Sequence, residues 1–586
     1  MKKISGCTLI IALVLGCAAL AVGCAGSPAS AAQEAVSAAR PRPAYQGDPD
    51  DLYGRSAVGK NGIVASAKPE ASQVGIDILK AGGNAVDAAV ATGFAIGVVE
   101  PNTSGLGGGG FMIIKLVNMP EAVVIDFREM APGASTPDMY VKAKAAGVKD
   151  PTETGGLSSG IPGDVKGLLY ALDNYGSKKL DRKQIMQGAI DLAENGFVVT
   201  SNFQGMIQDN LERINQYPAT AKIYTDDGLP PEPGTVIKNP DLAATLRLIA
   251  DKGESVIYKD LAQEIADAVQ AAGGILTVED LAKYEVKVRK PVTGTYKGYT
   301  IISVPPASSG GTTVIETLNI LENMDLSKLR PASAPAVHAW IQALRLAFAD
   351  RGSFLADSDF VDVPLKGMTS KDYARTLYQK FDPAKAMLSA AAGEPAKYES
   401  GSTTSFSVMD KEGNMVTITK TINFFFGSAV TVPGRGFIMN DEMDDFVTTP
   451  GHVQSVEPYK RPLSSMTPTL VLDPQGRPFM TLGSPGATRI IAAVAQIISN
   501  VVDHGMTIQE AIDAPRFFAT ASGQVHIEGR TPSATVEGLR KLGYDVNVHA
   551  DWDNYFGGAQ GAYFDQDTKT LYGGADPRRD GHAKAY

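Results

Sequence analysis

The sequence predicts an α+β fold in which β-strands lie between layers of helix. Two observations carry this prediction. Residues 181–350 are dominated by helical periodicity, whereas apolar and polar residues alternate in short runs after residue 403. A helix-like apolar segment at 489–502 follows those runs. Because sheets and helices each bury an apolar face against one another, the pattern favours sheets covered by helices.

The N-terminal part of the folded body predicts two helices and a strand. Residues 71–79 have helical periodicity, and Gly82-Gly83 end that helix. Asn84 has a side chain suited to an N-cap, which predicts a second helix that runs to about Val98. The apolar run at 111–116 predicts the first long strand.

The rest of the chain predicts a helical region followed by strands. Helices in the middle region end at Gly196 and Gly253, and Thr277–Asp280 resembles a capping box. Beyond Leu388 the residues become small and polar, and we expect a mobile segment before Ser402. The later pattern predicts strands at 404–408, 415–421, 469–472 and 479–482, a helix at 489–502, and a last helix capped by Thr507.

Length and charge limit the classes of function. At 586 residues the chain is long for one hydrophobic core, and length alone favours several domains. Its 44% hydrophobic and 20% charged residues are typical of a soluble globular protein. Lysine and arginine number 54 against 64 aspartates and glutamates, a net charge of −10. With no basic surplus to neutralise phosphates, we expect no nucleic-acid partner.

The first residues predict a secretory signal. Two lysines after Met1 precede an apolar stretch that runs to Val22. Residues 21–24 resemble a bacterial lipoprotein processing site, so we expect a signal peptide at 1–23 and a lipid on Cys24. Residues 24–55 are typical of a flexible tether. We therefore expect export to the periplasm or cell envelope, with a membrane contact only through this lipid anchor.

Other fates of this leader stay open. Residues 14–17 form a weaker lipoprotein-like site. Residues 29–31 offer ordinary signal-peptidase cleavage, which leaves no lipid. An uncleaved transmembrane anchor is a further alternative, although glycines and cysteines dilute the apolar stretch.

Cysteine and histidine usage predicts no metal and no cofactor. All three cysteines lie in the leader, so the body can form no disulfide and has no cysteine nucleophile. The six histidines are scattered without ligand spacing. The glycine-rich loop at 105–110 precedes a strand rather than opening a helix, so it is not a dinucleotide-binding fingerprint.

Four short motifs in the last third of the chain carry the chemistry. Each alone has an ordinary explanation, as a strand start, a solvated turn, a loop or a tight turn. Together they supply a threonine nucleophile, paired carboxylates, paired hydroxyls and a turn of backbone donors. Those groups suit an amidase that recognises an amino acid by its charged α-groups. The motifs are Ser402–Thr404, Asn440–Phe446, Lys460–Met466 and Gly483–Ala487.

With these motifs the chain resembles the γ-glutamyltransferases (glutathione hydrolases), a family of N-terminal-nucleophile hydrolases. The resemblance covers nearly everything from Gly59 to Tyr586. It implies a four-layer αββα sandwich, formed jointly by a large subunit at 56–402 and a small subunit at 403–586. Further upstream motifs that carry it are Ala81–Ala88, Gly105–Met112, Asp126–Glu129, Gly273–Leu276, Pro305–Gly311 and Ala347–Arg351.

The resemblance implies that the precursor cuts itself between Ser402 and Thr403, with Thr403 as the nucleophile and Thr421 supporting its hydroxyl. A threonine hydroxyl is a weak nucleophile and needs a base. The cut gives Thr403 a free α-amine, whose pKa of roughly 7.7–8.0 lets it accept the proton near neutral pH. The backbone N–H groups of Gly486 and Ala487 are the expected oxyanion donors.

The family's substrates are glutathione and other γ-glutamyl compounds, with water or an amino acid or peptide as acceptor. The resemblance implies that Arg128 binds the substrate α-carboxylate, since a guanidinium pairs with a carboxylate in a bidentate way. Ser464 and Ser465 would help it. The α-ammonium would bind Asp445, Glu442 and the carbonyl of Asn423. An ordinary salt bridge from Arg128 to Glu129 or Asp126 is the alternative.

Three departures from the family pattern bear on these expectations. Ala487 stands where many members have a second glycine, which keeps the backbone donor if the methyl group fits. Glu442 stands where many bacterial members have glutamine. The segment between Phe446 and Lys460 is short, which predicts an open pocket without a lid. Phe424-Phe425-Phe426 is an alternative lining for the acceptor side.

Three functions remain in competition. The leading one is a self-cleaving γ-glutamyl hydrolase and transferase. A cephalosporin acylase or a poly-γ-glutamate depolymerase on the same scaffold is the alternative. An inactive solute-binding lipoprotein is a third reading, which the intact Thr403, Thr421 and Gly486 disfavour.

Overall fold

The computed structural model describes residues 54–391 and 402–586. The predicted signal peptide, the predicted lipid-bearing Cys24, nearly all of the predicted tether and most of the small polar segment before Ser402 lie outside the described residues. Across the described part, no helix is both long enough and apolar enough to cross a membrane.

Two seven-stranded antiparallel sheets form the centre of the body. The first sheet has the order β1-β18-β17-β13-β12-β9-β8, and the second has the order β19-β2-β10-β11-β3-β4-β7. The first sheet contains β1 (Ser56–Gly59), β8 (Val292–Tyr296), β9 (Tyr299–Ser303), β12 (Thr469–Leu472), β13 (Pro478–Gly483), β17 (Gln560–Asp565) and β18 (Thr570–Ala575). The second contains β2 (Gly62–Ser66), β3 (Gly109–Lys115), β4 (Val123–Phe127), β7 (Lys287–Arg289), β10 (Ser402–Asp410), β11 (Met415–Asn423) and β19 (His582–Ala585).

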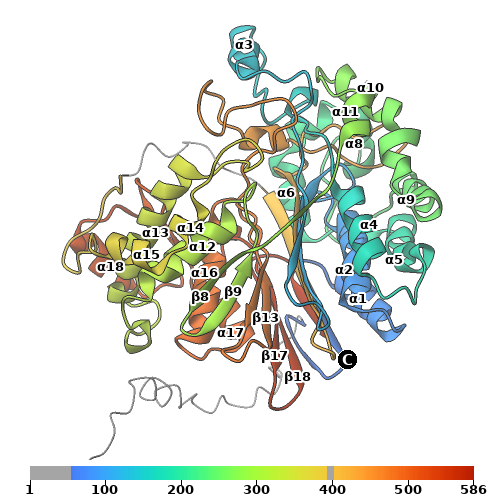
Figure 1. The fold of residues 1–586 in the computed structure, drawn as a ribbon. Coiled ribbons are helices and arrows are strands. Elements are labelled where there is room, and N and C mark those ends of the chain that lie inside the picture. The colour runs from blue at the N-terminus through green and yellow to red at the C-terminus, as the bar shows by residue number, and fades with distance from the viewer. Residues whose placement is uncertain (1–53, 392–401) are drawn as a thin grey trace, which may run out of the picture. The chain divides into compact units, whose positions relative to one another are not determined.

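The two sheets pack face to face, and helices cover their outer faces (Figure 1). Helices α1, α2 and α4 pack on the second sheet, and α5 and α9 lie outside them. Helices α12, α16 and α17 pack on the first sheet. This is the predicted four-layer αββα sandwich. Its main helices are α1 (Pro69–Lys80), α2 (Ala85–Val99), α4 (Asp164–Tyr175), α5 (Arg182–Asn195), α9 (Pro240–Lys252), α12 (Gly310–Leu321), α13 (Ala334–Phe354), α16 (Arg489–Val502) and α17 (Ile508–Asp513).

Smaller elements surround these layers. A three-stranded sheet of β14, β15 and β16 packs beside α13 and α16, and β5 pairs with β6. The remaining strands are β5 (Phe197–Val198), β6 (Val236–Ile237), β14 (Phe517–Phe518), β15 (Val525–Ile527) and β16 (Val546–Val548). The remaining α-helices are α3 (Met139–Ala145), α6 (Ser201–Asp209), α7 (Leu211–Asn215), α8 (Pro218–Tyr224), α10 (Ala262–Ala271), α11 (Val278–Lys283), α14 (Leu365–Met368), α15 (Lys371–Tyr378) and α18 (Ser533–Leu542).

Local capping signals are confirmed by the structure. Asn84 accepts hydrogen bonds from the N–H groups of Val86 and Asp87 and forms a capping box at the start of α2. Thr277 and Thr507 form the same box at α11 and α17. In each box the side chain satisfies a backbone donor that the first helical turn leaves without a partner.

The region from 181 to 350 is mainly helical, as predicted, but it also contains strands β5 to β9, which the sequence analysis did not expect. Residues 292–303 form the β8–β9 hairpin, which pairs with β12 and completes one edge of the first sheet. Lys297 and Gly298 both have positive φ, +50° and +86°, the backbone of a tight hairpin turn. The alternation of Val292, Gly294 and Tyr296 with threonine between them was a readable strand signal.

Candidate active site

Thr403 lies at the start of β10, one of two central strands of the second sheet. Its register partner on β11 is Thr421, and a β-bulge between Ser402 and Thr403 interrupts the ladder there. The Thr403 Oγ1 hydroxyl donates to Thr421 Oγ1 over a long 3.4 Å, and Thr421 Oγ1 also accepts the N–H of Asn423 at 2.7 Å. Thr403 is only 5% exposed. The sheet therefore places the Thr403 and Thr421 hydroxyls side by side.

The turn after β13 faces this hydroxyl pair. Gly486 has φ +124° and Ala487 has φ +52°. Their carbonyl oxygens accept from Arg489 and Ile490 at 3.1 and 3.0 Å and so begin α16. Within the described residues, neither the Gly486 nor the Ala487 N–H has a hydrogen-bond partner. Two free N–H groups at a helix N-terminus form an environment that favours negative charge.

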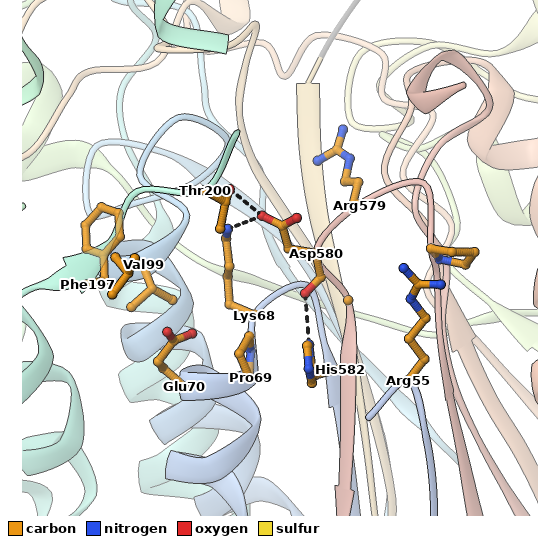
Figure 2. A pocket seen from close by; sticks show the side chains of 13 residues that line it. Arg55, Lys68, Pro69, Glu70, Val99, Phe197, Thr200, Arg579, Asp580 and His582 are labelled. Atoms are coloured by element: carbon orange, nitrogen blue, oxygen red, sulfur yellow. Dashed lines mark hydrogen bonds and ion pairs between the residues drawn. The ribbon is translucent and has the colours of Figure 1, made fainter. Parts of the chain in front are cut away.

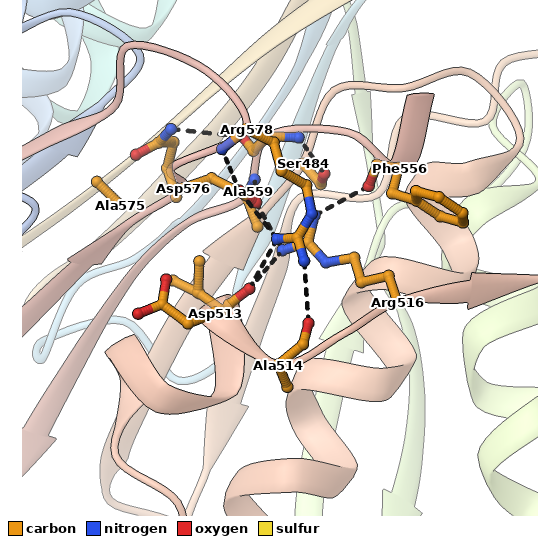
Figure 3. Close-up of polar contacts among 12 residues, drawn as sticks. Ser484, Asp513, Ala514, Arg516, Phe556, Ala559, Ala575, Asp576 and Arg578 are labelled. Carbon is orange, nitrogen blue, oxygen red and sulfur yellow. Dashed lines mark hydrogen bonds and ion pairs between the residues drawn. The ribbon is translucent and has the colours of Figure 1, made fainter. Parts of the chain in front are cut away.

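A cluster of buried charges supports the back of this turn (Figure 3). Arg516 pairs with Asp576 at 2.6 Å and donates to the carbonyl of Phe556 at 2.9 Å. Asp576 also accepts the N–H of Ala559 at 2.7 Å. The chain between these anchors passes close behind Gly486, where an added Cβ would lie 3.0 Å from the Cα of Gly557. The cluster therefore fixes the segment on which the turn rests.

Arg128 follows β4 and is 1% exposed. Its guanidinium forms ion pairs with Glu442 and Asp445, which both lie on the short 3-10 helix at 442–445. Its contact with Glu129 is longer, at 3.7 Å. The plain salt bridge with a neighbour in sequence is therefore a minor interaction of Arg128, because its main partners lie more than 300 residues away along the chain.

The carboxyl groups around Arg128 outnumber its charge. Glu129, Glu442 and Asp445 all lie near this one guanidinium. Burial raises the pKa of Glu129 to about 7, although Arg128 opposes that shift. Burial also raises the pKa of Glu442 well above its usual range. A second cation in this cluster would lower both values, because an opposite charge favours the ionised form of a carboxyl group.

Asn423 ends β11 and connects the hydroxyl pair to the acidic cluster. Its side-chain N–H donates to the carbonyl of Asp441 at 3.2 Å. The Asp441 carboxyl accepts the N–H of Phe424 at 3.0 Å and lies 3.7 Å from Arg213. Burial raises the pKa of Asp441 well above its usual range. Hydrogen bonds thus connect the backbone at the end of β11 with Asp441.

Ser464 and Ser465 are held by residues to which the sequence analysis assigned no role. The backbone carbonyl of Ser464 accepts from the N–H and the hydroxyl of Ser309, at 2.8 and 2.7 Å. Arg351 donates to the hydroxyls of Ser309 at 2.8 Å and Ser465 at 2.9 Å. Ser309 and Arg351 lie in motifs that carried the family resemblance, at 305–311 and 347–351. These two motifs were a signal that the sequence offered. The sequence does not show, however, that they support the loop that carries Ser464 and Ser465.

The predicted site residues come together around a small pocket. Its volume is about 20 Å³, room for about one water molecule. The pocket is small because Arg128 reaches across to Glu442 and Asp445, and the absence of a lid stays a prediction. Nine of the ten predicted catalytic and binding residues line the pocket, and Gly486 immediately precedes one of them. The nine are Arg128, Thr403, Thr421, Asn423, Glu442, Asp445, Ser464, Ser465 and Ala487.

No metal site is found in the part of the chain that the structure describes. No group of three histidine, cysteine or carboxylate side chains is placed there to hold a metal ion.

Comparison with known families and proteins identifies the scaffold. A family model described as Gamma-glutamyltranspeptidase matches residues 71–586. The chain belongs to the gamma-glutamyltranspeptidase family. It is 38% identical over 560 residues to the glutathione hydrolase proenzyme of Escherichia coli (strain K12), covering 93% of this chain and 95% of that protein.

Other proteins similar to this chain have acylase names. The chain is 39% identical over 536 residues to the acylase ACY 1 proenzyme of Pseudomonas sp. (strain SE83), covering 90% of this chain and 94% of that protein. Its fold resembles the crystal structure of a cephalosporin acylase from Bacillus halodurans, with a TM-score of 0.83 and 29% identity over 93% of this chain and 98% of the other. Proteins similar to this chain thus include some named glutathione hydrolases and some named acylases.

Proposed function

We propose that this chain is a γ-glutamyl hydrolase and transferase that matures by cutting its own Ser402–Thr403 bond. One observation carries the proposal. The Thr403 hydroxyl shares a small pocket with a paired hydroxyl, a guanidinium and an excess of carboxyl groups. The names of related proteins, glutathione hydrolase proenzymes, support the same activity.

The reaction follows from these groups. After the cut, the neutral α-amine of Thr403 takes the hydroxyl proton, and the oxygen attacks the γ-carbonyl carbon of the substrate. Thr421 stabilises the hydroxyl, and the N–H groups of Gly486 and Ala487 bind the oxyanion, where one donor is typically worth about 2.7–4 kcal/mol. The departing amine receives the proton. Water, or the amine of an amino acid or peptide, then attacks the γ-glutamyl ester and regenerates Thr403.

The charge imbalance around Arg128 favours an α-amino acid as the bound group. A γ-glutamyl substrate brings an α-carboxylate and an α-ammonium side by side. The carboxylate replaces the acidic partners of Arg128, and the ammonium supplies the second cation for Glu442 and Asp445. Arg128 then pairs with the substrate carboxylate, and Glu442 and Asp445 pair with the ammonium, so no buried charge is left alone. We propose the carbonyl of Asn423 as a further ammonium acceptor, and the Ser464 and Ser465 hydroxyls as donors to the carboxylate.

The second candidate is an acylase, which the similarity to ACY 1 and to the cephalosporin acylase supports. A glutaryl amide has the carboxylate but no ammonium. It would leave the acidic cluster with the same deficit of positive charge. The geometry therefore favours γ-glutamyl over glutaryl amides, and a poly-γ-glutamate chain stays an alternative source of γ-glutamyl groups.

A denaturing gel tests self-cleavage. The purified protein should run as two fragments, the smaller being residues 403–586, or 586 − 402 = 184 residues. N-terminal sequencing of that fragment should begin Thr-Thr-Ser-Phe-Ser. Thr403→Ala should stay a single chain. A different N-terminus would move the nucleophile away from Thr403.

Two pocket variants test substrate recognition separately from self-cleavage. Arg128→Ala and Asp445→Ala should still yield two fragments, because the internal bond carries no α-charges. Loss of one partner of a buried charge pair costs on the order of 2–5 kcal/mol, so kcat/KM for glutathione hydrolysis should fall roughly 30-fold or more. Assays with and without glycylglycine separate transfer from hydrolysis. Wild-type kcat/KM and an unchanged preference over glutaryl amides in Asp445→Ala would favour the acylase.

We further propose that the protein is exported and anchored by a lipid on Cys24. The lipoprotein-like sequence at 21–24 motivates this proposal. Cys24→Ser should move the protein from the detergent phase to the aqueous phase. A wild-type protein already in the aqueous phase would favour cleavage at 29–31.

A further inference from the structure

A buried arginine outside the substrate pocket contacts the backbone of the nucleophile itself. Arg579 Nη1 donates to the carbonyl oxygen of Thr403 at 2.8 Å. The same nitrogen lies 3.3 Å from Glu100 Oε1, and the side chains of Arg579 and Glu100 are 4% and 5% exposed. None of the groups assigned to substrate binding takes part in this contact. It approaches Thr403 from a different set of elements.

The C-terminal strands and α2 bring the pair to Thr403. Arg579 lies between β18 and β19, and Glu100 follows the last residue of α2. Arg579 also lines a second pocket of about 300 Å³. Figure 2 shows its side chain directed away from the ion pair of Lys68 and Asp580, which also line that pocket. The guanidinium therefore contacts Thr403 and Glu100 rather than that ion pair.

This contact acquires an electrostatic role when the Ser402–Thr403 bond is cut. The Thr403 nitrogen is then an amine that must be neutral to accept the hydroxyl proton. Its nitrogen is separated from the carbonyl oxygen that Arg579 holds by only the Cα and carbonyl carbon atoms. A like charge at this distance disfavours the protonated amine, and burial strengthens the effect. Glu100 acts in the opposite sense, because it partly neutralises Arg579.

Resting on the proposed function, we propose that Arg579 is a positioning residue that holds the Thr403 carbonyl and keeps the free α-amine neutral, while Glu100 sets the strength of this effect. The pair thus tunes the base of the reaction from outside the substrate pocket. In the uncut chain the same nitrogen is an amide, so the electrostatic role exists only after cleavage.

Other charged groups near Thr403 and Arg579 are common to every variant in the test below. They therefore shift all the measured values together and cancel in the comparison. From the substrate pocket these groups are Arg128, Glu442 and Asp445, and beside Arg579 they are Asp576 and Asp580.

Two single variants of the processed enzyme should shift the amine in opposite directions. Arg579→Gln removes the cation and leaves Glu100, so the pKa of the Thr403 amine should rise by on the order of one unit. Glu100→Gln leaves the cation uncompensated, so that pKa should fall by a similar amount. One unit upward means about tenfold less neutral amine at pH 6. Arg579→Lys keeps the charge and should stay near wild type.

The Arg579→Gln/Glu100→Gln double variant is the matched control for folding. It removes both charges, so no buried ion is left without a partner. Its amine pKa should lie between those of the two single variants. If Arg579→Gln does not cleave itself, the Glu100→Gln variant alone tests the proposal. Loss of a purely structural contact at Glu100 would not lower the pKa of the Thr403 amine.

Direct labelling of the amine gives a readout that needs no substrate. Competitive acetylation of the Thr403 amine from pH 5 to 9, followed by mass spectrometry of the peptide that begins at Thr403, gives its pKa in each variant. The acid limb of kcat/KM for a γ-glutamyl anilide should move in parallel. Opposite shifts in the two single variants support the inference. Equal labelling curves, or lower kcat without any shift of the acid limb, overturn it and leave Arg579 a purely structural contact.

Absence of γ-glutamyl turnover would count against the proposed function alone. The labelling arm would still report on Arg579, because it requires only a processed N-terminal threonine. The two failures are therefore distinguishable in one set of proteins.

Discussion

Ala487 has the least common backbone conformation among the oxyanion donors. Its φ of +52° lies in the left-handed region, which costs an L-residue with a side chain roughly 1–2 kcal/mol. The preceding residue, Gly486, has φ +124° and bears no such cost because it has no side chain. A glycine at position 487 would remove the cost there as well. The methyl group thus fits the turn, but at some expense in stability.

Ala487→Gly should therefore raise the urea midpoint of the processed enzyme and keep kcat/KM within about threefold. The donor is a backbone N–H, so the substitution removes no functional group. A gain on the order of 0.5–1 kcal/mol is expected, because glycine also adds freedom to the unfolded chain. Ala332, at φ +55°, is the matched control: Ala332→Gly should give a similar gain away from the site. A large loss of activity in Ala487→Gly alone would show that the methyl group positions the substrate.

Glu129 links the acidic cluster to the pH dependence of stability. Its folded pKa is about 7, above the ordinary 4.5, chiefly because it is buried. Between these values the folded state holds a proton that the unfolded state has lost. Stability from this group is therefore present below pH 4.5 and declines as pH rises towards 7.

Glu129→Gln should remove that decline. The variant and the wild type should have similar urea midpoints at pH 5, and the variant should be the more stable at pH 8. Glutamine keeps the shape, so packing against Gly109 and Gly160 is preserved. Guanidine or urea titrations at the two pH values measure the difference. An equal difference in midpoint between variant and wild type at both pH values would show that Glu129 is ionised in the folded state at pH 5 as well as at pH 8.

At the scale of the elements, local signals were readable and distant pairings were not. The capping boxes of α2, α11 and α17 depend on residues three apart, so the sequence displays them. Strands β12 and β13 were also predicted within a residue or two. The β8–β9 hairpin was missed because helices on either side of it set the expectation, although Lys297-Gly298 is a turn signal.

The candidate site shows the same limit. The motifs that supply Thr403, Asp445 and Ser465 are visible in sequence. The direct pairing of Arg128 with Glu442 and Asp445 depends on where a guanidinium and two carboxyls meet in space, and so does the small volume of the pocket. The contact of Arg579 with Thr403 spans 176 residues and involves a backbone atom. No residue pattern announces such a contact.

Helix α2 tests how far one local element supports the nucleophile strands. It packs on β10 and β11, and its N-cap Asn84 also donates to the carbonyl of Tyr175 at 2.9 Å. Asn84→Ala should lower stability by about 1 kcal/mol. Asn84→Ser keeps the cap acceptor and loses the Tyr175 contact, so urea midpoints of both variants separate the two contributions. Equal losses in the two variants would assign the effect to Tyr175 rather than to the cap.

At the scale of the whole molecule, the proposed cut leaves two chains that share both sheets. In the second sheet, β10 and β11 come after Ser402, yet they lie between β2 and β3, which come before it. In the first sheet, β12, β13, β17 and β18 from the C-terminal part are flanked by β1 on one side and β9 on the other. Neither part has a complete sheet of its own. Self-cleavage therefore changes the covalent structure around Thr403 without creating two separable domains.

The two fragments of the processed protein should consequently stay associated until the whole fold is lost. Size-exclusion chromatography in native buffer should give one peak that contains both bands of the denaturing gel. In increasing urea, dissociation of the fragments and loss of circular dichroism should have the same midpoint, because separation requires breaking the β2–β10 and β3–β11 ladders. Residues 403–586 expressed alone should lack a cooperative transition, since β10, β11 and β19 would lose the strands between and beside them. The uncut Thr403→Ala chain is the control, with a similar native elution volume and a single band. Dissociation well below the unfolding midpoint would show that the interleaved strands contribute little to holding the subunits together.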